Sequence, residues 1–129
     1  MTELTDRAVN FFRDAAQCPE GQWMLRGNVK DVHLMCQFDP KDDEPFYVEI
    51  IAGEVSVKEG RLASQAYDYP RIRAYKKDLL DIFQGKIRPY AAKRANKWDI
   101  SWRDRRGGIF TVLVRIGQDV VRERIIQNA

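Results

Sequence analysis

The residue types that most often carry covalent or metal chemistry are scarce in this chain, which contains one histidine, His33, and two cysteines, Cys18 and Cys36. His33 lies in a segment of alternating apolar residues, and a single histidine in a strand is more often structural than catalytic. The cysteines are far apart and match neither a zinc-site spacing nor a disulfide framework. We therefore expect two free thiols, no metal site, no cofactor and no catalytic residue.

Carboxylates gather at two places, and each place has a non-catalytic explanation. The first group follows the strand-like segment around His33 and consists of Asp39, Asp42, Asp43 and Glu44. It lacks the Asp-x-Asp-x-Asp-Gly order of a calcium loop, and its prolines and acidic residues favour a solvated hairpin turn. The second pair, Asp78 and Asp81, falls on the outer face of a predicted helix, as is typical of solubilising carboxylates. Residues 84–87 contain a Gly-Lys pair, but the upstream glycine and the following Ser or Thr of a phosphate-binding loop are missing.

The net charge of +3 conceals an uneven distribution along the chain. Residues 1–70 contain 7 basic and 13 acidic side chains, whereas residues 71–106 contain 12 basic and 4 acidic ones. This asymmetry predicts one positive surface that could meet phosphate on a lipid head group, a coenzyme or a nucleic acid.

Length and composition predict a single folded domain over residues 1–129, because 44% of the residues are hydrophobic and 32% are charged. No segment approaches the roughly twenty uninterrupted apolar residues of a membrane span. Glu3 and Asp6 stand where a signal peptide would be apolar. We therefore expect a cytoplasmic location.

The hydrophobic pattern predicts the helices and strands that position these polar and charged residues. Alternation of apolar and polar residues predicts five strands, at residues 31–38, 46–50, 55–57, 71–75 and 98–102. Helical spacing predicts helices at residues 2–15, 77–85 and 89–95. Thr2 would cap the first helix, Pro19 and Gly21 would end it, and Gly85 would end the second.

The segment 109–116 is compatible with two structures. Its β-branched residues would suit a strand paired with residues 98–102. Its apolar residues also recur at helical spacing, and the stripe continues through Val121 and Ile125. We favour a helix over residues 108–127 and keep the strand as the alternative.

The order of these elements and the sequence of residues 78–89 together resemble the sterol carrier family, also called nonspecific lipid-transfer domains. In residues 78–89, an acidic residue and paired hydrophobes precede Gly85-Lys86, a hydrophobe and Pro89. The segment 46–57 is similar to the second and third strands of that family, with Gly53 between them. The resemblance covers about residues 29–102.

The resemblance implies an α+β fold, with a five-stranded, mostly antiparallel sheet and helices packed on one face. It also implies a hydrophobic cavity that accepts fatty acids, acyl thioesters, phospholipids or sterols without covalent chemistry, so we expect no enzyme activity. The chain departs from the family after Pro89, where residues 90–98 lack the usual glycine of a Gly-Lys pair. The family's peroxisomal C-terminal tripeptide is also missing. Ligand size and head group therefore cannot be transferred from the family.

Two sets of residues are candidates for such a ligand site. The apolar candidates are Phe38, Phe46, Ile50, Phe83, Ile87, Trp98, Trp102, Phe110 and Leu113. The basic candidates for the cavity entrance and the head group are Lys86, Arg88, Lys93, Arg94 and Lys97. Without the resemblance, the first set would be interpreted as packed core and the second as solvated surface.

Two other functions remain open at this stage. The basic residues, joined by Arg103, Arg105 and Arg106, could bind nucleic-acid phosphates while Tyr90, Trp98 and Trp102 stack on bases. Alternatively, the cavity could be filled and the exposed surface could bind another protein. Against nucleic acid, the two tryptophans alternate with Ile100 and should point inward, and a transient contact with an anionic membrane would explain the charge equally well.

Overall fold

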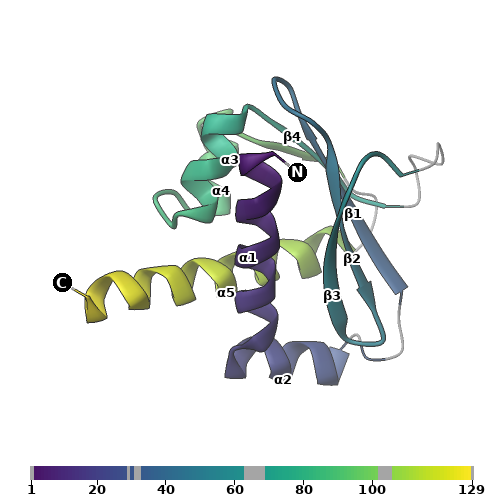
Figure 1. Ribbon diagram of the computed structural model, residues 1–129, viewed down its shortest axis with the longest axis vertical. Coiled ribbons are helices and arrows are strands. Elements are labelled where there is room, and N and C mark those ends of the chain that lie inside the picture. Colours follow the sequence, from purple (N-terminus) through teal and green to yellow (C-terminus); the bar gives the residue numbers. More distant parts are fainter. Residues whose placement is uncertain (1, 29, 31–32, 63–68, 102–105, 129) are drawn as a thin grey trace.

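The computed structural model describes residues 2–28, 30, 33–62, 69–101 and 106–128. Its elements, in chain order, are α1 (Glu3–Gln17), α2 (Pro19–Asn28), β1 (His33–Pro40), β2 (Phe46–Ile51), β3 (Glu54–Glu59), β4 (Arg71–Ala74), α3 (Lys76–Phe83), α4 (Pro89–Arg94), β5 (Asp99–Ser101) and α5 (Arg106–Gln127). The helices gather on one face of the sheet, and α5 runs away from it (Figure 1).

The sheet has five strands in the order β3-β2-β1-β4-β5. β1 pairs with β2, β2 with β3 and β4 with β5 in antiparallel fashion, whereas β1 and β4 are parallel. The predicted fold class, with a mostly antiparallel sheet and helices on one face, is therefore confirmed. The parallel pair arises because the chain crosses from the edge strand β3 to the opposite side of β1.

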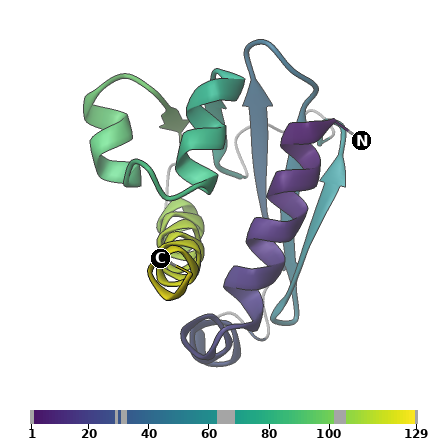
Figure 2. The ribbon, with the colours of Figure 1, turned by 60° about the vertical axis from the view of Figure 1, so that its left-hand side comes forward.

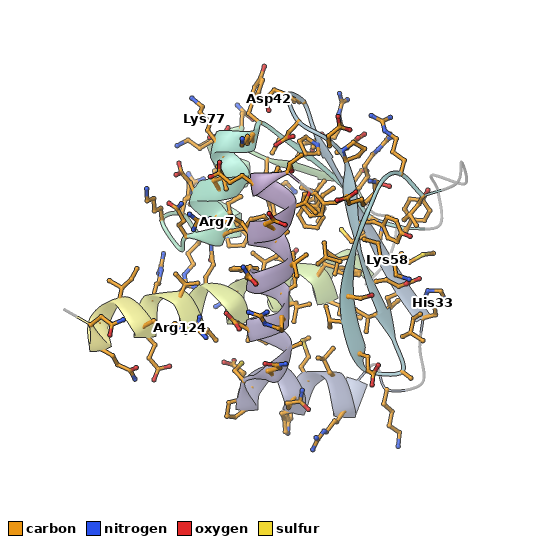
Figure 3. All side chains as sticks on the ribbon, in the orientation of Figure 1. Arg7, His33, Asp42, Lys58, Lys77 and Arg124 are labelled. Carbon is orange, nitrogen blue, oxygen red and sulfur yellow. The ribbon has the colours of Figure 1, made fainter. Side chains whose placement is uncertain are left out.

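Alternation along the strands separates an apolar face, which packs against the helices, from a more polar outer face. Leu34, Cys36 and Phe38 of β1 point toward the helices and are at most 4% exposed. On the other face, His33 and Lys58 project from the sheet away from the helices (Figure 3). The predicted inward positions of β4, Ile72 and Ala74, are likewise buried.

The helical layer is organised around α5. Seen nearly end-on, α5 has α1 on one side and α3 and α4 on the other (Figure 2). Phe110, Leu113 and Val114 of α5 are completely buried, and a Cβ atom at Gly117 would lie 2.5 Å from the Phe11 ring of α1. The absence of a side chain at Gly117 thus allows α1 and α5 to cross closely.

The first predicted helix and its end before Pro19 are confirmed, but the helix that follows it was not predicted. Thr2 accepts a hydrogen bond from the Thr5 amide as the expected cap. Pro19 and Gly21, however, do not lead into a loop: after Cys18 the chain starts α2 directly. Proline is compatible with the first turn of a helix because that amide needs no partner. Gly21 fits because a Cβ atom there would overlap the Ala15 carbonyl oxygen.

The remaining helices agree with the sequence except in detail. Segment 109–116 belongs to α5, so the alternative strand was wrong. α3 ends at Phe83, so Ile87 lies in the turn before α4. Asp78 was predicted on the outer face of α3 but is only 7% exposed. It stands in the first turn, where the unpaired amides of a helix N-terminus favour a carboxylate.

The described residues contain no helix that combines the length and apolar character needed to cross a bilayer. Cys18 and Cys36 are free thiols, as predicted. Burial raises the pKa of the Cys36 thiol well above its ordinary value. Cys36 therefore behaves as a small apolar core residue.

The crossing of α1 and α5 can be tested with two glycine substitutions. Gly117→Ala should destabilise the protein by roughly 1–3 kcal/mol, because Phe11 is buried among other rings and cannot move away freely. Gly27→Ala is the control: Gly27 is an exposed helical glycine with open space, so alanine should stabilise by up to about 1 kcal/mol. Urea unfolding of both variants measures the difference, and equal stabilisation would contradict the close crossing.

Candidate functional site

An apolar groove opens at the edge of the helical layer, where α4 and α5 meet the last strand. It has a volume of about 430 Å³. We call it the α4–α5 groove; its lining residues are Pro89, Tyr90, Lys93, Arg94, Trp98, Ile100 and Thr111. A volume of this size lies within the range of small-molecule sites, roughly 300–1,000 Å³.

Local sequence explains how α4 forms one wall of this groove. Pro89 occupies the first turn of α4, as predicted, and Ala92 is completely buried on its inner side. Asn96 then adopts a positive φ of 56°, which asparagine tolerates better than most residues. The chain turns there, and Trp98 and Ile100 enter the sheet edge with exposures of only 4% and 8%.

Two side chains hold α4 against α5. The Gln118 amide nitrogen donates hydrogen bonds to the carbonyl oxygens of Ile82, at 2.9 Å, and Ile87, at 2.6 Å. Arg88 forms an ion pair of 2.7 Å with Asp119, the next residue of α5. Gln118 is completely buried, so these bonds fix the turn between α3 and α4 from inside the protein.

The groove combines apolar surface with positive charge. Trp98, Ile100 and Pro89 supply the apolar surface, while Lys93 and Arg94 are exposed and line the same groove. The Arg94 guanidinium lies 5.8 Å from the centre of the Tyr90 ring, within cation–π range. No acidic residue is among those that line the groove in the described part of the chain. The arrangement suits a molecule with a hydrocarbon part and an anionic or polar end.

Most of the predicted apolar ligand residues lie elsewhere, in the packed core between helices and sheet. Phe38 stacks on Phe46 with a centroid distance of 4.8 Å, and Phe83 lies 4.9 Å from Phe11. Phe12 contacts both Phe38 and Phe83. The others in the core are Ile50, Phe110 and Leu113, all completely buried, with Ile87 partly buried against them. Their contact with a ligand stays a prediction.

The structure brings only some of the predicted apolar and basic residues together at the groove. Trp98, Lys93 and Arg94 line it. Lys97 is exposed one residue before Trp98. Arg88 instead pairs with α5, and Lys86 lies 3.9 Å from Asp81. Trp102, Arg103 and Arg105 lie outside the described residues, as does the side chain of Arg106.

Sequence reasoning missed a second apolar groove, between α2 and α5. Its volume is about 370 Å³, and its lining residues are Glu20, Trp23, Met24, Gly108, Ile109, Val112 and Ile116. Trp23 is 76% exposed at its rim. Because α2 itself was not predicted, no pattern in the sequence assigned Trp23 to a groove.

Three titratable residues interact on the outer face of the sheet, away from the helices. Lys58 forms an ion pair of 2.9 Å with Glu49, and His33 lies 2.8 Å from the same carboxylate. The hydrogen bond from Lys58, supported by His33, lowers the pKa of Glu49. The resulting stabilisation is present above the ordinary pKa of glutamate and is lost as the pH falls through the lowered value. Among the described residues, no group of three or more His, Cys, Asp or Glu is arranged to hold a metal ion.

Comparisons with known proteins identify the fold. Neither a protein-family model nor a curated protein sequence matches this chain. Solved structures do match: a ubiquinone synthesis protein described as UbiJ-SCP2 has a TM-score of 0.63 and 14% identity, over 88% of this chain and 95% of that one. Palmitated SCP2L2 from Aedes aegypti has a TM-score of 0.62 and 18% identity, over the same shares of the two chains.

Sterol carrier protein 2 from Yarrowia lipolytica matches with a TM-score of 0.56 and 9% identity, over 92% of this chain and 96% of that one. A sec-alkyl sulfatase, PisA1, also matches with a TM-score of 0.54 and 17% identity, but 77% of this chain covers only 16% of the sulfatase. The chain therefore has the fold of the sterol carrier proteins, as the resemblance of residues 29–102 implied.

The hold of Gln118 on the α3–α4 turn can be tested with Gln118→Met. This variant should lower the free energy of unfolding by roughly 1–3 kcal/mol, because two carbonyl oxygens lose their buried donor. Amide hydrogen exchange over residues 89–97 should also accelerate. Gln17→Met, at an exposed site on α1, is the control and should change neither quantity. Native exchange in the Gln118 variant would show that α4 is held in another way.

Proposed function

We propose that this chain binds an apolar, lipid-like molecule in the α4–α5 groove. The hydrocarbon would lie against Trp98 and Ile100, and the polar or anionic end would lie near Lys93 and Arg94. The observation that carries the proposal is an apolar groove with two cationic side chains on a fold shared with a structure described as palmitated.

Burial of hydrocarbon supplies enough affinity for such a ligand without specific polar contacts. Each methylene group that leaves water contributes about 0.8 kcal/mol. A groove with so few polar groups would discriminate by length and by the charge of one end rather than by detailed recognition. We therefore expect several amphiphiles with similar chains to bind. We further propose that the chain transfers such a ligand between membranes.

The position of Trp98 weakens the nucleic-acid alternative. A base-stacking platform needs exposed aromatic faces. Trp98 is only 4% exposed, so the small part of it that lines the groove could contact a hydrocarbon chain but offers no open ring face on which a base could stack. Among the described aromatic residues from α4 to β5, only Tyr90 is exposed. The burial of Trp98 and the open groove beside it favour a small apolar ligand instead.

The location of the ligand can be tested by contact quenching of single tryptophans. In the variant Trp23→Phe/Trp102→Phe, Trp98 is the only tryptophan left, and a brominated fatty acid should quench its emission in a saturable way, because the bromine would lie in the groove. Emission is measured during titration of the acid below its critical micelle concentration.

The matched control is Trp98→Phe/Trp102→Phe, which leaves only Trp23 in the α2–α5 groove. Its quenching should be weak and should not saturate. Saturable quenching of Trp23 in place of Trp98 would move the site to the other groove. The absence of saturable quenching in both variants would remove the proposed function.

Ligand length provides a separate test. Shortening a saturated fatty acid by two methylene groups should weaken binding by roughly tenfold, because about 0.8 kcal/mol is lost for each buried methylene. Competition against a fluorescent fatty acid measures the series. An affinity independent of chain length would mean that the hydrocarbon does not enter an apolar site.

A further inference from the structure

The surface around the α4–α5 groove is rich in positive charge. Residues 86–97 contain five basic side chains and no acidic one. Arg88 pairs with Asp119, and Lys86 lies near Asp81. Within the described part of the chain, no carboxylate pairs with Arg94 or Lys97, and both are exposed.

The same surface presents an aromatic side chain to solvent. Tyr90 is 72% exposed on the outer side of α4, next to exposed Ala91. Tyrosine has an apolar ring and a polar hydroxyl, so it is suited to the boundary between lipid head groups and acyl chains. An exposed tyrosine near Arg94 and Lys97 matches the chemistry of an anionic bilayer surface.

We propose that the α4 surface, formed by Tyr90, Lys93, Arg94 and Lys97, docks onto bilayers that contain anionic lipids. The groove opens between these side chains, so docking would place its opening directly against the head groups. This inference rests on the proposed function, since an acyl chain could then pass between bilayer and groove without crossing water. Basic residues near an anionic bilayer each contribute to attraction within about a Debye length, which is roughly 8–10 Å at physiological salt.

Charge selects this surface over the other apolar surface of the molecule. The α2–α5 groove has the more exposed aromatic residue, Trp23, but Glu20 lines it. On α2, Arg26 is balanced by Glu20, and Lys30 lies two residues after the helix. An anionic bilayer would therefore be attracted to α4 and only weakly to α2.

Co-sedimentation with vesicles tests the proposal. Wild-type protein should bind phosphatidylcholine vesicles that contain phosphatidylglycerol, should not bind pure phosphatidylcholine vesicles, and should be released by salt. Arg94→Glu/Lys97→Glu should weaken this binding by about thirtyfold, since each lost basic residue removes roughly a factor of five. Arg26→Glu/Lys30→Glu has the same net charge but changes one exposed residue in α2 and one just after it, so it should bind nearly as wild type.

The two proposals fail in different ways. Quenching of Trp98 by a neutral brominated fatty alcohol, measured without vesicles in the Trp23→Phe/Trp102→Phe background, should persist in Lys97→Glu, because Lys97 does not line the groove. Equal loss of vesicle binding in both double variants, or equal binding to neutral vesicles, would overturn docking through α4 while leaving ligand binding intact. Inhibition by millimolar inorganic phosphate would assign the surface to free phosphate. Tighter binding to single-stranded nucleic acid at the same salt would assign it to nucleic acid.

Discussion

The close crossing of α1 and α5 at Gly117 is the constraint on which the helical layer depends. The Phe11 ring of α1 packs directly against Gly117. The side chain of the next residue, Gln118, donates hydrogen bonds to the carbonyl oxygens of Ile82 and Ile87, at the turn between α3 and α4. Two consecutive residues of α5 therefore set the helix that covers the sheet and the helix that forms a groove wall. Any shift of α5 along its axis would disturb both sides of the layer at once, because packed interiors transmit such displacements.

The interior is divided between a packed aromatic core and the groove beside it. Under α1, the rings of Phe12, Phe38 and Phe83 contact one another and fill the space between helix and sheet. Near β5, Trp98 and Ile100 do not fill the space beside α4 and α5, and the α4–α5 groove remains there. Aromatic rings thus fill one half of the layer, while the other half contains the open groove.

The sequence predicted the elements better than it predicted their partners. Alternation and turn residues located the strands, and Gly85 and Pro89 marked the boundary between α3 and α4, because these signals are local. α2 was missed because Pro19 and Gly21 usually end helices, and only the packing of Gly21 against Ala15 reveals their role. For the site, periodicity identified buried residues but could not separate core from groove lining. Arg88 was predicted to face a ligand head group, but it forms an ion pair with Asp119. This contact joins segments that are far apart in the sequence, so residue spacing could not predict it.

The lengths of the strands would affect how quickly a ligand in the groove binds and dissociates. β1 has eight residues, whereas β4 has four and β5 only three, so the sheet is least extensively hydrogen-bonded at the edge beside the groove. Local opening costs least where few bonds and contacts must break. Fraying of β5 would widen the opening while the aromatic core stayed intact, so residence time would be governed by this edge rather than by global unfolding.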